Sequence, residues 1–357
     1  MMRIVLALLF ALIAGPAMAQ LSTSPGEVMR GAVNNFIRPA MTDFGGKADA
    51  LSTAVAQLCT TPSQANLSAV DTAFANTALA FGRIEAIRVG PIMEENRAER
   101  LLFWPDRKGI ALKQVQAILS SQDESATSPE TLRSKSVAVQ GLTALEFVLY
   151  GTGFEALNTA DGAFRCRYGL AIAQSVANVA DELVAAWNAE DGIALHLMKP
   201  DATFTDFRTP VEAQEELVGI LSHGIEAVRD TRLNPFLAKG AAAAKPKLAL
   251  FWRSGLTVPM ARANIDGLQA LYDLSGIDGG VPADRTALPV AISAEFAQAD
   301  AALDLVTDPV ETAVADPAQA QALADVVTAT QQLGVLIGEQ LSSALGLSVG
   351  FSSLDGD

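Results

Sequence analysis

Histidine and cysteine are scarce in this chain of 357 residues, which has only two of each. His196 and His223 lie in no HExxH pattern, the helical arrangement that gives zinc hydrolases two imidazoles and a carboxylate. No CxxCH haem-attachment pattern, Gly-rich phosphate loop or GxSxG elbow is present. These absences leave little sequence support for a zinc peptidase, a c-type cytochrome, a nucleotide-binding enzyme or a serine hydrolase.

Long hydrophobic runs are also missing, because no stretch after residue 19 reaches the roughly 18 apolar residues that a transmembrane helix needs. The beginning of the chain has Arg3, an apolar run over 4–14 and the small-residue site Ala17-Met18-Ala19. This pattern is typical of a secretory signal peptide, and no cysteine follows the site to accept a lipid anchor. We expect cleavage after Ala19 and export of the mature protein to the periplasm or cell envelope.

Basic side chains are outnumbered, with 25 Lys and Arg against 40 Asp and Glu and a formal net charge of −15. A chain this acidic is repelled by phosphate backbones, so we expect no nucleic-acid partner. The charge either favours cationic partners and metal ions or only keeps an exported protein in solution. The two cysteines, Cys59 and Cys166, are either one disulfide of an oxidising compartment or two separate buried thiols.

A helix start recurs along the chain, in which a capping side chain precedes Pro and a Glu or Gln follows two residues after the Pro. It occurs at Ser24-Pro25-Gly26-Glu27, Thr61-Pro62-Ser63-Gln64, Thr209-Pro210-Val211-Glu212, Asp308-Pro309-Val310-Glu311 and Asp316-Pro317-Ala318-Gln319. Apolar residues at helical spacing follow these starts, and alternating strand-like runs are scarce. The sequence therefore predicts an all-α fold.

Two octapeptides in this chain are similar, Val139–Glu146 and Ile265–Tyr272, and each follows a Phe-Trp pair. The similarity indicates two similar, four-helix-type bundles packed as a pseudo-repeat, unless it is a coincidence of Ala- and Leu-rich helices. Helical periodicity is interrupted near residues 190–208. We therefore expect an N-terminal bundle over 20–190 and a C-terminal bundle over 208–357.

Four separated stretches carry a family resemblance. They are Glu85–Pro91 leading into Phe103–Lys108, then Gly141–Glu146, then Phe251–Leu256 followed by Asn264 and Gly267-Leu268, and finally the tail Leu345–Asp357. In this order they resemble the imelysin family, which includes iron-regulated protein A-like proteins and was historically classed with metallopeptidases, over residues 28–350. The resemblance implies a two-bundle helical fold, export and a connection to iron uptake.

The family's GxHxxE motif, whose His and Glu are its proposed metal-binding or functional pair, is altered in this sequence. Gly141 and Glu146 are present, but Thr143 stands at the place of the His. A neutral hydroxyl is a poor ligand for iron or zinc. Glu146 is then the one candidate metal ligand of the motif, for iron or another divalent ion.

Glu146 shares the apolar stripe of its helix, where an unpaired carboxylate would be costly to bury. Its partner is predicted to be a guanidinium, with Arg88 the first candidate and Arg165 or Arg167 the next; a ligand pocket and partial exposure are the alternatives. Gly141 would permit the close approach of a neighbouring helix, since Gly is otherwise unfavourable within a helix.

Glu85 and Arg88 share a helix face and either form a local ion pair or line the same pocket as Glu146. Trp104 and Asp106 would close that pocket, unless Trp104 belongs to the core.

The leading hypothesis is a non-enzymatic envelope protein that takes part in uptake of iron or another metal. The second is a scaffold that binds an envelope protein or a peptide. A metallopeptidase comes third, because Thr143 removes the motif imidazole and no HExxH pattern replaces it.

Overall fold

The computed structural model describes residues 23–106, 108–239 and 243–348, and these residues form helices joined by turns, without a strand. The predicted all-α class is therefore confirmed. None of the described helices combines the length and the apolar character needed to cross a membrane. The predicted signal peptide over 1–19 and the end of the family-like tail, 349–357, lie outside the described residues.

The first half of the chain builds a bundle of four main helices, α2, α3, α7 and α8, called here the N-terminal bundle. In it α2 packs against α3 and α8, and α7 packs against α8. The π-helical segment η1 (Ala32–Ile37) joins α1 to α2. The α-helices of this half are α1 (Pro25–Gly31), α2 (Arg38–Thr60), α3 (Gln64–Ile84), α4 (Arg97–Leu101), α5 (Ile110–Ser121), α6 (Pro129–Arg133), α7 (Gly141–Tyr150), α8 (Ala163–Asn188) and α9 (Ile193–Met198).

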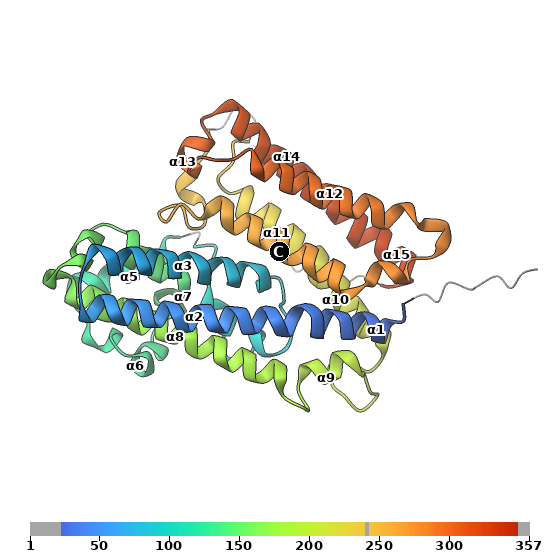
Figure 1. Cartoon of the computed structure of the whole chain (residues 1–357), viewed down its shortest axis with the longest axis horizontal. Helices are drawn as coiled ribbons and strands as arrows, with labels where there is room; N and C mark the ends of the chain where they lie inside the picture. Colours follow the sequence, from blue (N-terminus) through green and yellow to red (C-terminus); the bar gives the residue numbers. More distant parts are fainter. Residues whose placement is uncertain (1–22, 107, 240–242, 349–357) are drawn as a thin grey trace, which may run out of the picture.

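The second half builds a further bundle of four main helices, α10, α11, α12 and α14, called the C-terminal bundle. The π-helical segments η7 (Val228–Leu233) and η11 (Gly334–Leu341) extend α10 and α14. Figure 1 shows this bundle in yellow to red beside the blue and green N-terminal one. Its α-helices are α10 (Pro210–Ala227), α11 (Thr257–Ser275), α12 (Ala287–Asp304), α13 (Val310–Ala313), α14 (Pro317–Leu333) and α15 (Ser342–Leu345).

The two bundles meet where α11 packs against α3. Gly267 permits this contact, because a Cβ atom there would lie 2.7 Å from the carbonyl carbon of Arg83. The first helix also takes part, since α1 packs on α10 and η1 packs on α11. The buried apolar side chains form one continuous cluster through both halves. Residues 25–37, although they precede the N-terminal bundle in the sequence, therefore help to cover the C-terminal bundle.

The two similar octapeptides do not occupy equivalent places. Gly141 is the first residue of α7, whereas Gly267 lies well inside α11. The two similar octapeptides therefore do not lie at equivalent positions of the two bundles.

Three of the predicted capped helix starts occur as written, at Ser24, Thr209 and Asp316, each of which accepts hydrogen bonds from backbone N–H groups in the first turn. Two predicted starts were wrong in position. Thr61 ends α2, and Ser63 caps α3 by accepting from the N–H of Asn66 at 3.2 Å. Asp308 instead accepts from the side chain of Gln319, so α13 begins at Val310.

Cys59 and Cys166 form a disulfide that joins the end of α2 to the start of α8, with their Cα atoms 5.5 Å apart. The sequence left this pairing open against two separate thiols. The bond closes a loop of 107 residues, and cross-linking a loop of this size restricts the unfolded chain strongly in the chain-entropy account of disulfides.

We expect the double substitution Cys59→Ala, Cys166→Ala to lower the free energy of unfolding by about 2–4 kcal/mol, through this gain of freedom in the unfolded chain. Urea denaturation of the oxidised wild type and the variant would measure the difference. A reductant should lower the stability of the wild type only; an equal response of both proteins would contradict the prediction.

Candidate functional site

The motif helix α7 begins at a residue that has to be glycine. Gly141 has φ +75°, in the left-handed region that favours glycine. A Cβ atom on it would also lie 2.5 Å from the carbonyl oxygen of Leu101, at the end of α4. The predicted close approach of a neighbouring helix is thus the contact between α4 and the first turn of α7.

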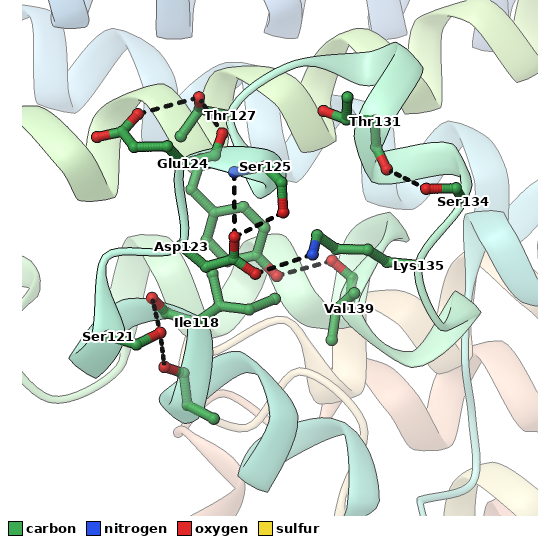
Figure 2. Close-up of polar contacts among 12 residues, drawn as sticks. Ile118, Ser121, Asp123, Glu124, Ser125, Thr127, Thr131, Ser134, Lys135 and Val139 are labelled. Atoms are coloured by element: carbon green, nitrogen blue, oxygen red, sulfur yellow. Dashed lines mark hydrogen bonds and ion pairs between the residues drawn. The ribbon is translucent and has the colours of Figure 1, made fainter.

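The segment leading into α7 is held by polar contacts, shown in Figure 2. The carboxylate of Asp123 accepts from the N–H and hydroxyl of Ser125, at 3.1 and 2.6 Å, and from the ammonium of Lys135 at 2.8 Å. The Lys135 contact is the main reason that the pKa of Asp123 is lowered to about 2. The hydroxyl of Tyr168 on α8 donates to the carbonyl of Val139 at 2.7 Å. These contacts fix the approach to Gly141.

Glu146, one turn further along α7, is 4% exposed and binds the backbone of the other half of the chain. Its Oε1 accepts from the N–H of Arg253 at 3.1 Å, and from the N–H and hydroxyl of Ser254 at 3.0 Å each. These neutral donors satisfy the hydrogen-bonding capacity of Oε1, but they do not neutralise the carboxylate as a guanidinium would. Glu146 therefore connects the motif helix to the turn that precedes α11.

The predicted guanidinium partners of Glu146 were wrong. Arg88 contacts Glu85, Arg165 donates to the carbonyl of Val148 at 2.8 Å, and Arg167 pairs with Glu124 at 2.6 Å. Each arginine thus contacts an acceptor other than Glu146.

Burial raises the pKa of Glu146, and the hydrogen bonds from Ser254 and the charge of Arg253 oppose this shift only in part. The folded protein therefore holds this proton more tightly than the unfolded chain does. Such a group makes the protein less stable as pH rises from the ordinary glutamate pKa towards the raised one.

We compare the wild type with Glu146→Gln, which keeps an oxygen to accept from Arg253 and Ser254. The stability of the wild type minus that of the variant should fall as pH rises above the ordinary glutamate pKa of about 4, because only the wild type must give up a proton there. Urea denaturation at a series of pH values would measure it. A difference that increases with pH would contradict the prediction, and Glu94→Gln on the surface serves as control.

A cavity of about 280 Å³ opens beside Glu146. It lies between α5, α7 and residues 247–253, and its lining is mostly apolar, with both aliphatic and aromatic side chains. Its polar and charged lining comes from Asp106, Thr143, Glu146, Lys247 and Arg253, and its aromatic lining from Phe103, Trp104, Phe147, Phe251 and Trp252. The cavity thus brings together Thr143, Glu146, Trp104 and Asp106 from the sequence-based candidates.

Three of these side chains already form hydrogen bonds with backbone groups of the protein. Asp106 accepts from the N–H groups of Ile110 and Ala111, at 2.7 and 3.0 Å, and so caps α5. The indole of Trp104 donates to the carbonyl of Thr231 at 3.1 Å. The hydroxyl of Thr143 makes a long contact of 3.4 Å with the carbonyl of Phe103.

The imelysin family model matches residues 37–337. This chain belongs to the imelysin family. It is similar in fold to the crystal structure of an imelysin-like protein from Psychrobacter arcticum 273-4, at 19% identity and a TM-score of 0.74, over 92% of this chain and 97% of that one. It is also similar to a putative iron-regulated protein A precursor from Parabacteroides distasonis ATCC 8503, at 15% identity and a TM-score of 0.69, over 91% and 96%. No curated protein matches the sequence.

Two further candidates lie away from the cavity of this imelysin. Glu85, 8% exposed, pairs with Arg232 of η7 and accepts from the amide of Asn264 at 2.9 Å. The guanidinium of Arg88 is 4.0 Å from the same carboxylate. Glu85 and Arg88 therefore form the local contact that was one reading of the sequence, and Glu85 also holds the junction of α3 with the C-terminal bundle.

The imelysin motif residues of this chain do not suit a bare metal ion. Across the described residues, no group of three or more His, Cys, Asp and Glu side chains is placed to hold one. Glu146 supplies one carboxylate, and its Oε1 already accepts three hydrogen bonds. Arg253 and Lys247 add positive charge to the same cavity. A divalent ion here would need most of its ligands from outside the protein.

Residues 247–254 contribute to this site in a way that was not predicted from the sequence. Phe251, Trp252, Arg253 and Ser254 stood out as part of the family resemblance, but no contact with Glu146 was predicted from them. The family resemblance of this stretch marked it as a candidate. Its contact with Glu146 joins residues 107 positions apart, and it depends on how the two bundles dock.

Proposed function

We propose that this imelysin-family protein is exported to the cell envelope, where it binds a small ligand in the cavity beside Glu146 and takes part in uptake of iron or another metal without catalysing a reaction. Export is supported by the pattern of residues 1–19. The metal connection is supported by the family and by the name of one structural relative, an iron-regulated protein A precursor.

The observation that carries the proposal is the cavity at the motif helix. It is concave, largely apolar and supplied with a few converging charged groups, which is the usual make-up of a small-molecule site. Glu146 in its wall is the proposed protein contact for the metal. Because the remaining ligands are lacking, the metal would enter together with other donor groups.

The absence of catalysis is supported by Thr143, which cannot act as an imidazole base or a zinc ligand. Neither histidine lines the cavity. His196 lies on α9 and pairs with Asp206 at 2.9 Å, and His223 lies on α10. We expect the purified mature protein to leave a peptide library uncleaved in the presence of zinc or iron. Metal-dependent cleavage would favour a metallopeptidase instead.

Iron accumulation tests the proposed function. Cells lacking this protein should accumulate less iron from iron-poor medium, and the wild-type gene should restore uptake. Thr143→Trp, which fills the cavity from α7, should fail to restore it although the protein is exported and folded. Restoration by Thr143→Trp, or normal uptake without the protein, would overturn the proposal. Thr72→Trp on the surface of α3 is the matched control.

Calorimetry on the metal-stripped protein tests whether the motif binds a bare metal ion without other donor groups. We expect free ferrous, ferric, copper and zinc ions to bind more weakly than micromolar, because one carboxylate is insufficient. Micromolar binding that is lost in Glu146→Gln would instead show a complete metal site at the motif.

A scaffold for a protein or peptide partner is the second candidate. It is favoured by an exposed apolar side chain in the lining of the cavity, Leu248, which is 49% exposed. Envelope proteins that are retained by the wild type and released by Leu248→Ser would support this alternative.

A further inference from the structure

The two positively charged side chains at the cavity form no ion pair with a described carboxylate. Arg253 and Lys247 both line the cavity, and within the described residues neither has a carboxylate oxygen within 4.0 Å. Both cations lie over aromatic rings. The Arg253 guanidinium is 4.5 Å from the ring centre of Trp252 and 5.3 Å from that of Phe147, and the Lys247 ammonium is 5.5 Å from that of Trp252.

The two carboxylates of the cavity do not neutralise these cations by direct contact. Asp106 is turned to the N-terminus of α5, where it accepts from two backbone N–H groups at 3.0 Å or less. Oε1 of Glu146 accepts from the backbone of Arg253 and from Ser254. The charge of Arg253 acts on Glu146 at longer range only. An incoming anion therefore meets two available cations, while the acidic groups are already hydrogen-bonded.

The walls restrict the shape of such an anion. Trp104 and Trp252 lie in the lining with three phenylalanines. Flat rings pack favourably against aromatic side chains in offset or edge-to-face arrangements. The volume of about 280 Å³ lies at the lower end of ligand pockets, which leaves room for a small molecule only.

We propose that the cavity binds a small planar organic carboxylate, whose anionic group pairs with Arg253 and Lys247 and whose ring packs against Trp104 and Trp252. This inference rests on the proposed function, because it names the class of ligand that enters the same cavity. A free carboxylate and a carboxylate that carries iron share this chemistry.

Benzoate is the probe, with benzamide as its uncharged isostere. Calorimetric titration of the mature protein should give one benzoate site, with benzamide bound about tenfold more weakly or not at all. Tryptophan fluorescence offers a second readout, since Trp104 and Trp252 line the cavity while Trp187, the third tryptophan, is fully buried in α8. Raising the ionic strength should weaken benzoate and leave benzamide unchanged.

Substitutions locate the site. Arg253→Gln should weaken benzoate about tenfold, and Lys247→Met, at an exposed position where folding is unaffected, about threefold. Lys245→Met removes the same charge from the neighbouring surface and should leave the affinity unchanged, because Lys245 is not among the lining residues. Equal binding of benzoate and benzamide, no binding of either, or full benzoate affinity in both Arg253→Gln and Lys247→Met would overturn the inference.

Salicylate, with and without ferric ion, distinguishes the two sources of the carboxylate. Tighter binding with iron supports a chelate as the ligand, and equal binding supports the free acid. Failure of the inference is separable from failure of the proposed function: reduced iron accumulation without benzoate binding would overturn only the ligand class. Benzoate binding with normal iron accumulation would overturn only the role in uptake.

Discussion

Replacing Gly141 with Ala is expected to lower the free energy of unfolding by about 4 kcal/mol. The left-handed φ of +75° costs an alanine about 1–2 kcal/mol. The added Cβ would lie 2.5 Å from the carbonyl oxygen of Leu101, and overpacking of this kind costs about 1–3 kcal/mol more. Because α4 ends at Leu101 and α7 begins at Gly141, the clash separates two helices rather than displacing a side chain.

Chemical denaturation would measure the effect. Substitutions at two other glycines separate the cost of the left-handed φ from the cost of the clash. Gly276 has φ +69° with open space around its Cβ position, so Gly276→Ala should show the cost of φ alone. Gly46 lies within α2 and also faces open space, so Gly46→Ala should stabilise the protein by about 0.5–1 kcal/mol. If Gly141→Ala proved no more costly than Gly276→Ala, the close approach of α4 would be refuted.

Glu85→Ala is the second substitution with a large expected effect, a loss of about 3–5 kcal/mol. The carboxylate pairs with Arg232, which is 8% exposed, and accepts from Asn264. Its removal leaves a guanidinium in the junction of α3 with η7 and α11 without its carboxylate partner, although the hydroxyl of Thr231 still contacts it. The loss of stability arises mainly because the buried guanidinium of Arg232 remains charged without a carboxylate partner, and less from the lost attraction between Arg232 and Glu85.

A double-mutant cycle separates these two contributions. Glu85→Ala with Arg232→Met should recover much of the stability, because no buried charge is then left unpaired. Glu94→Ala, which breaks a surface pair with Arg97, should cost at most about 1 kcal/mol. A double variant as unstable as the sum of the two single ones would show that Glu85 and Arg232 act independently.

Local signals in the sequence predicted much of the fold. The helix starts at Ser24, Thr209 and Asp316 are decided within one turn, so the residue pattern is sufficient. The predicted start at Thr61 was wrong because α2 continues up to that residue. Ser63 is then the residue that caps α3.

The candidate site was predictable in part. Thr143, Glu146, Trp104 and Asp106 line one cavity, and Trp104 also packs against the core, which was the alternative reading of that residue. The partner of Glu146 was not predictable from residue types, because two backbone N–H groups at Arg253 and Ser254 replace the expected guanidinium. Any residue except proline carries such a donor, so the sequence gives no sign of which segment will supply it.

The packing of α1 on α10 and of η1 on α11 also determines how the chain can be divided. Val28 and Met29, from the beginning of the chain, are buried. A fragment that starts at residue 208 would lack this cover and expose an apolar groove. A protease that cut the connection between α9 and α10 would produce two polypeptides that remain one particle, so gel filtration would report an intact protein while a denaturing gel would show two bands.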